Sequence, residues 1–153
     1  MNMNVWTIFK DSATIIVALV SAIVALSVYW KNAITRRVEF LYDLHTSFFV
    51  NETYKAVRKV LDDSSEKAAA RRAAFVRDEP EQFTDFLNFF ELVAYLEQRR
   101  NLSLKDVEAL LGYYLTLFEQ HSDVRSYVRN PKNGFEQLNG LLDKLHTRAG
   151  VKR

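Results

Sequence analysis

Histidine and carboxylate side chains are the groups in this sequence best suited to acid–base or metal chemistry, and their spacing favours neither. The histidines His45, His121 and His146 are far apart and have no carboxylate at the spacing of a metal site. His121 and Asp123 flank a serine, but such close neighbours on one helix point in different directions. Glu91 lies inside an apolar segment, where a paired structural carboxylate is favoured over a general base.

The remaining catalytic signatures are also missing from the sequence. The chain has no cysteine, which excludes a disulfide scaffold, a thiolate metal site and a cysteine nucleophile. It contains no HExxH motif, no glycine-rich phosphate loop and no nucleophile elbow. We therefore predict a protein that is not an enzyme, with no catalytic residues, no metal and no cofactor.

Basic side chains are the second group that could act chemically, by binding an anion. The formal net charge is only +2, which does not fit a protein that coats duplex DNA. Any anionic ligand must therefore be held by a local cluster of cations. Four clusters are present: Lys31 with Arg36 and Arg37; Lys55, Arg58 and Lys59; Arg71 and Arg72, with Arg77 further on; and Arg99 with Arg100.

The last cluster is the most informative, because it ends the most apolar predicted helix. Arginines at a helix C-terminus can simply offset the helix dipole. If four copies of the chain met at this helix, the paired arginines would instead line an axial cavity that favours a multiply charged ligand. Asn101 and Tyr95 would then read and stack a base. The predicted ligand-binding residues are Tyr95, Arg99, Arg100, Asn101, Arg71 and Arg72. For Lys55, Arg58 and Lys59 a solvated helix face is the favoured interpretation.

The N-terminal element that would position these groups is a membrane helix. No charge interrupts the segment from Ser12 to Trp30, which at about 1.5 Å per residue reaches roughly across the hydrocarbon core of a bilayer. Aromatic residues flank it and cations follow it, so the positive-inside rule predicts a cytoplasmic C-terminal domain. The alternatives are a cleaved signal peptide, with Ala25 near the cleavage site, and a buried core helix. The predicted membrane-interface residues are Trp6, Tyr29, Trp30, Lys31, Arg36 and Arg37.

We predict three parts: a transmembrane segment in residues 1–30, a helical stalk over 31–50, and a cytoplasmic ligand-sensing domain over 51–153. This gives a single-pass protein of the bacterial inner membrane with its N-terminus outside. Ala18, Ala22, Ala25 and Tyr29 form a small-residue face that allows close helix approach, although such residues are common in membrane helices. The stalk carries a heptad seam of Ile34, Val38, Leu41, His45 and Phe48, in which a structural His45 is favoured over a switch.

The cytoplasmic part is predicted to be all-α. Helices are expected over 51–63, over 66–78 and over 80–100, with Asn51 capping the first of them. Ser103 and Asp106 predict a capping box at the start of a long helix that carries Leu104 through Phe118. A turn at 130–134 precedes a last helix.

A family resemblance rests on this layout and on the segment LNFFELVAYLEQRRNLSLKDVEALLGYYL, Leu87–Leu115. The chain resembles the membrane effectors of type III CRISPR systems, in particular the small Vibrio-type effectors that sense cyclic tetra-adenylate. It is also similar to a broad family of uncharacterised, membrane-anchored helical bacterial proteins. The first resemblance implies a tetrameric antiviral defence protein. Cyclic tetra-adenylate would bind its cytoplasmic domains and perturb its membrane helices, opening a pore or breaching the bilayer.

Two other functions are compatible with the residues. A passive membrane-tethered scaffold would recruit a protein partner through the aromatic-rich helix over 80–100. A hidden hydrolase would cleave the ligand that it binds, although no metal or nucleophile constellation supports it.

Overall fold

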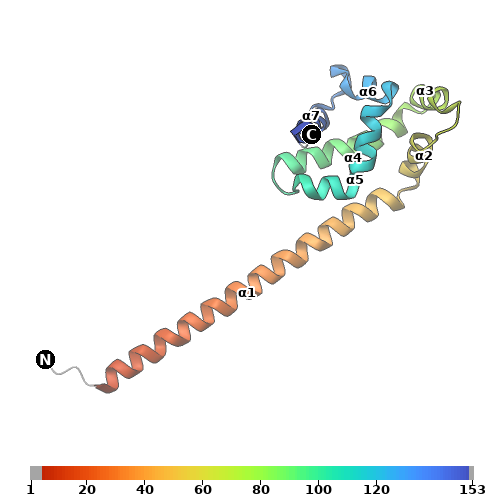
Figure 1. The fold of residues 1–153 in the computed structure, drawn as a ribbon. Coiled ribbons are helices and arrows are strands. Elements are labelled where there is room, and N and C mark those ends of the chain that lie inside the picture. Colours follow the sequence, from red (N-terminus) through yellow and green to blue (C-terminus); the bar gives the residue numbers. More distant parts are fainter. Residues whose placement is uncertain (1–4, 152–153) are drawn as a thin grey trace. The chain divides into compact units, whose positions relative to one another are not determined.

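The computed structural model describes the backbone of residues 5–151 and the side chains of residues 14–148 and 150. Throughout this part of the chain the regular elements are helices, which confirms the predicted all-α class (Figure 1). The chain divides into two compact units, one ending at Asp43 and the other starting at Leu44. The elements are α1 (Val5–Val50), α2 (Glu52–Leu61), α3 (Ala68–Asp78), α4 (Pro80–Gln98), α5 (Leu104–Gln120), α6 (Ser122–Arg129), η1 (Pro131–Asn133) and α7 (Glu136–Val151).

The unit that ends at Asp43 contains most of α1. From Thr14 onward this helix is long and apolar enough to cross a membrane, and its apolar window is wholly exposed. The hydroxyls of Ser21 and Ser27 donate to the carbonyls of Val17 and Ile23, at 2.9 and 2.8 Å. These bonds satisfy the hydroxyl groups within the helix itself, as a lipid environment requires.

The second unit begins at Leu44, earlier than the predicted boundary at residue 51, because Phe48 lies at the centre of its core. Phe48 is fully buried. Its ring stacks on Phe89 with centroids 5.1 Å apart and meets the edges of Phe90 and Tyr114 at 5.5 and 5.2 Å. Such aromatic pairs contribute beyond the area that they bury. The last residues of α1 therefore belong to the helical domain.

Arg58 of α2 binds the C-terminal end of α1. The prediction that Arg58 belongs to a solvated helix face was therefore wrong. The side chain is only 7% exposed. Its guanidinium donates to the carbonyl of Phe48 and, at 2.9 Å, to that of Phe49. Both carbonyls belong to the last helical turn, where no intrahelical donor is left to satisfy them. The guanidinium also lies 5.0 Å from the centroid of the Phe48 ring, so this cation packs against the core instead of facing solvent.

Helix α4 occupies the middle of the domain and contacts α2, α3, α5 and α7. Its phenylalanine side chains are buried within the domain. Glu91 is structural, as predicted: its carboxylate accepts from the backbone N–H groups of Gln137 and Leu138, at 2.9 and 2.7 Å. A carboxylate at this position offsets the positive end of the α7 dipole. The buried residues of α4 are Phe83, Phe86, Leu87, Phe89, Phe90, Val93 and Ala94.

Two predicted helix starts are confirmed. The Asn51 side chain accepts from the N–H groups of Thr53 and Tyr54 at the start of α2. Ser103 and Asp106 form both halves of a capping box at α5. The sequence did not predict α6 as a separate helix. It begins at Ser122, after His121 interrupts the helical structure.

Candidate functional site

The turn between α4 and α5 holds the predicted cluster around Arg99. The backbone here forms a Schellman motif, because the N–H of Asn101 donates to Leu96 and that of Arg100 to Glu97, both at 2.9 Å. The motif places one residue in the left-handed region, a position that glycine usually occupies. Here it is Arg100, with φ of 61°, and it is the only non-glycine residue of the described chain with a positive φ.

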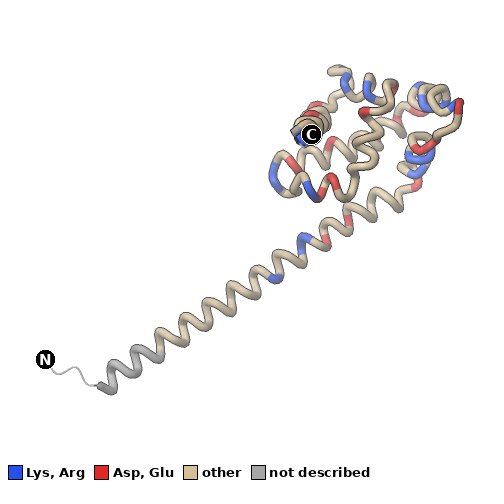
Figure 2. The backbone as a smooth tube through the Cα atoms, viewed as in Figure 1, with Lys and Arg blue, Asp and Glu red and all other residues tan. Residues whose placement is uncertain are grey.

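The side chains at this turn point into solvent. Arg99, Arg100 and Asn101 are all exposed, and Figure 2 shows blue cationic positions at the turn that joins α4 to α5. The Arg99 guanidinium lies 5.3 Å from the centroid of the Tyr95 ring, which is 42% exposed. A cation stacked on an open aromatic face offers a phosphate partner and a surface for a base side by side.

Arg99 and Arg100 differ from the other described arginines after Leu44, because their guanidinium groups have no hydrogen-bond or ion-pair partner. Within the described residues from Leu44 onward, neither forms a hydrogen bond or ion pair through its guanidinium. Each of the other arginines there engages a carboxylate or a backbone carbonyl. These are Arg58, Arg71, Arg72, Arg77, Arg125, Arg129 and Arg148. The two arginines of the turn are therefore available to an anion without breaking an internal contact.

Arg71 and Arg72, predicted to join the same site, lie elsewhere. Arg72 is 8% exposed, and its Nε lies 3.4 Å from Asp123 of α6, so it ties α3 to α6. Arg71 pairs with Asp63 at 3.0 Å. Both sit on α3, before the N-terminus of α4, whereas Arg99 follows its C-terminus. The whole of α4 lies between the two groups in the chain.

The predicted membrane-interface residues lie on α1. Tyr29 and Trp30 are 70% and 69% exposed, as side chains at headgroup depth would be without lipid around them. Trp6 lies outside the residues whose side chains are described. Lys31, Arg36 and Arg37 are also exposed on this helix.

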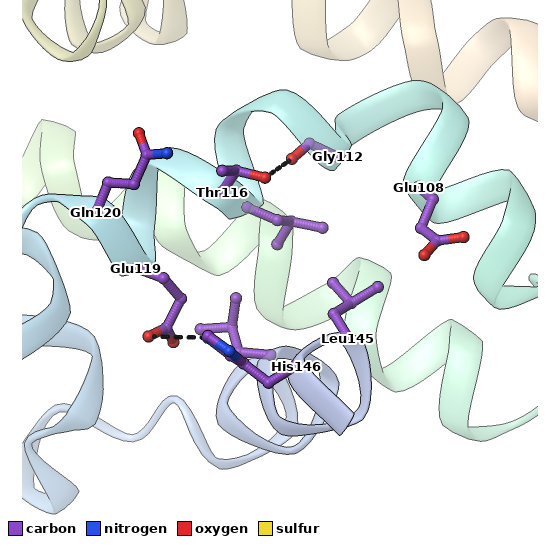
Figure 3. Close-up of a pocket in the computed structure, with 9 residues that line it drawn as sticks. Glu108, Gly112, Thr116, Glu119, Gln120, Leu145 and His146 are labelled. Atoms are coloured by element: carbon purple, nitrogen blue, oxygen red, sulfur yellow. Dashed lines mark hydrogen bonds and ion pairs between the residues drawn. The ribbon is translucent and has the colours of Figure 1, made fainter. Parts of the chain in front are cut away.

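A pocket between α5 and α7 was missed by the sequence reasoning. Its volume is ≈ 620 Å³, and in its wall His146 Nε2 lies 3.3 Å from Glu119 Oε2 (Figure 3). Arg129 holds the other oxygen of Glu119 at 2.7 Å. A sequence signal was present, because Glu108, Gly112 and Thr116 recur every fourth residue of an apolar helix. The lining consists of Glu108, Gly112, Leu115, Thr116, Glu119, Gln120, Leu142, Leu145 and His146.

Several polar groups of this pocket are engaged in contacts within the domain. Both oxygens of Glu119 are already engaged by cationic or titratable partners. The Thr116 hydroxyl donates to the carbonyl of Gly112 at 2.8 Å and is not directed at His146. Among the described residues, no group of three or more histidine, aspartate or glutamate side chains is placed to hold a metal ion.

No protein-family model, characterised protein or solved structure matches this chain. Inference about its function therefore rests on the residues and their geometry.

Proposed function

We propose that the protein is a membrane-anchored sensor whose helical domain binds an anionic nucleotide through the turn between α4 and α5. The expected ligand is a cyclic oligoadenylate, with cyclic tetra-adenylate as the first candidate. The observation that carries the proposal is the exposed pair Arg99 and Arg100, which have no internal partner among the described residues, beside the open ring of Tyr95.

The chemistry of this turn suits a phosphate linked to a base. A guanidinium forms paired hydrogen bonds with phosphate oxygens, and two adjacent arginines match a ligand with several phosphates. An aromatic face stacks a base without requiring one sequence. The Asn101 amide, exposed next to the arginines, has both a donor and an acceptor for a base edge.

One turn alone offers few contacts, so the proposal includes symmetric assembly. A cyclic ligand with four equivalent phosphates is matched by four equivalent turns around one axis. Each copy would then supply the same two arginines. Repulsion between these cations in the empty state would be relieved by the ligand, so the ligand would favour the assembled arrangement.

The proposed response is a perturbation of the membrane helices that opens a pore or disrupts the bilayer, as in antiviral defence. It is supported by the length and apolar composition of α1 and by the absence of glycine and proline between Thr14 and Val50. In this proposal the chain is a single-pass protein of the bacterial inner membrane, with the N-terminus outside and the helical domain in the cytoplasm. The domain acts as a sensor and carries out no catalysis.

The test uses the full chain in lipid nanodiscs for binding and in dye-loaded vesicles for leakage. Saturable binding of cyclic tetra-adenylate at micromolar concentration, together with ligand-dependent dye release, is expected. Replacing Arg99 and Arg100 by Ala should abolish both effects. The matched control is Arg77→Ala, because Arg77 is also exposed but is occupied by Asp78 at 2.8 Å. No saturable binding, or equal loss in the control, would overturn the proposal.

A further inference from the structure

Helix α4 presents a narrow exposed stripe along the side opposite its buried aromatic residues. The members recur at alternating spacings of four and three residues, which is the spacing of a helix seam that packs against another helix. All six are exposed although the helix itself is central to the domain. They are Glu81, Asp85, Asn88, Leu92, Tyr95 and Arg99.

The chemistry of the stripe changes along its length. Its N-terminal end is acidic, its middle holds Leu92 and Tyr95, which are 52% and 42% exposed, and its C-terminal end is Arg99. In the part of the chain that is described, neither Asp85 nor Arg99 forms an ion pair. The stripe therefore carries two opposite charges, Asp85 and Arg99, and neither is in an ion pair among the described residues.

These charges are placed symmetrically. Asp85 and Arg99 lie the same number of residues before and after Leu92, at about 10 Å along the helix in each direction. A second copy laid antiparallel against the first, with a two-fold axis at Leu92, would bring each Asp85 opposite the Arg99 of the other copy. A parallel arrangement would instead set like charges against each other.

A groove beside the stripe provides the matching shape. It encloses ≈ 330 Å³, and its walls include Asp85, Asn88 and Leu92 of α4 together with Tyr54 of α2. In the antiparallel arrangement Tyr95 of the second copy lies at the level of Phe89, which also lines this groove. Its ring would fill the hollow as a side-chain knob fills a hole.

We propose that two copies of this protein pair through the stripe on α4, antiparallel about a two-fold axis at Leu92. The interface contains Leu92 against Leu92, each Tyr95 in the groove of the other copy, and two Asp85–Arg99 ion pairs. With one helix from each copy the buried area is small, so this is a weak contact. Anchoring on one membrane strengthens it, because tethering raises the effective concentration of the partner. The pairing shares Arg99 with the proposed nucleotide site, so its tests contain no nucleotide.

The first test uses disulfide trapping, since the chain has no native cysteine to interfere. Full-length Leu92→Cys in membrane vesicles, treated with copper phenanthroline, should form a covalent dimer. The control is Ser126→Cys, an exposed position on α6 away from the stripe, which should cross-link at least about tenfold more slowly. Equal rates for the two variants would overturn the proposal.

The direction of the pairing is tested by mixing two variants in the same vesicles. Asp85→Cys and Arg99→Cys copies should form the mixed disulfide when combined, and each alone should form little dimer. Efficient cross-linking of Asp85→Cys with itself would indicate a parallel contact and would overturn the antiparallel arrangement.

Charge reversal tests the ion pairs in the Leu92→Cys background. Asp85→Arg alone and Arg99→Asp alone place like charges together and should each slow cross-linking several-fold. The double variant Asp85→Arg/Arg99→Asp should recover the original rate, because each reversed charge again faces its opposite. Failure of the double variant to recover, with a circular dichroism spectrum that shows an intact fold, would refute the contact.

Discussion

Replacing Arg100 by glycine should stabilise the helical domain although it removes a charge. Arg100 has a φ of 61°, a region that costs an L-residue roughly 1–2 kcal/mol because its Cβ crowds the following carbonyl. Glycine avoids that crowding but adds about 0.5–1 kcal/mol of chain entropy to the unfolded state. Taken at the middle of these two ranges, the net gain is about 0.75 kcal/mol. The Schellman hydrogen bonds are made by the backbone and remain in place.

The assay is thermal unfolding of the full chain in nanodiscs, followed by tyrosine near-UV circular dichroism. A gain of this size should raise the midpoint by about 2–5 °C for a domain of this length. Arg100→Ala is the first control, because alanine keeps the Cβ and should show no rise. Arg99→Gly is the second, because Arg99 has an ordinary φ of −77°, so glycine there should lower the midpoint.

Equal midpoints for Arg100→Gly and Arg100→Ala would refute the reasoning from backbone strain, and a rise in Arg99→Gly would do the same. The variant also separates stability from the proposed function. If Arg100→Gly is more stable but no longer binds cyclic tetra-adenylate, the Arg100 side chain is needed for binding despite the backbone strain at this position. A chain that is more stable and binds normally would remove Arg100 from the proposed site.

Three further predictions concern the interior of the domain. Arg58→Ala should destabilise it by about 3 kcal/mol in urea unfolding, because the end of α1 loses two charged hydrogen bonds; Arg58→Lys should recover only part of this. Glu91→Gln should cost about 1–2 kcal/mol and speed hydrogen exchange at Gln137 and Leu138, whose N–H groups lose a charged acceptor. Burial raises the pKa of Tyr114 to about 12, so the fold favours the neutral phenol. The stability that Tyr114 contributes is then complete below pH 10 and lost as the pH rises from 10 to 12. Tyr114→Phe should therefore lose less stability than the parent chain over that window, and an equal loss in both would contradict the assignment.

The sequence determined those features that depend on near neighbours. The apolar segment from Ser12 to Trp30 indicated a membrane-length helix because no charged side chain interrupts it. The caps at Asn51 and Ser103 were readable because a capping side chain bonds to a backbone group two or three residues away. The helical class followed from the same local periodicities.

The tertiary structure alone decided which charged residues are free. Arg58, Arg71 and Arg72 look alike in sequence, but contacts with α1, with the turn after α2 and with α6 engage them. Such partners are brought together by the packing of helices, and no local pattern encodes them. The left-handed conformation of Arg100 is likewise invisible in a sequence that lacks the usual glycine at that position. From Leu44 onward, the two described arginines with no hydrogen-bond or ion-pair partner are those of the turn after α4, whose side chains are exposed.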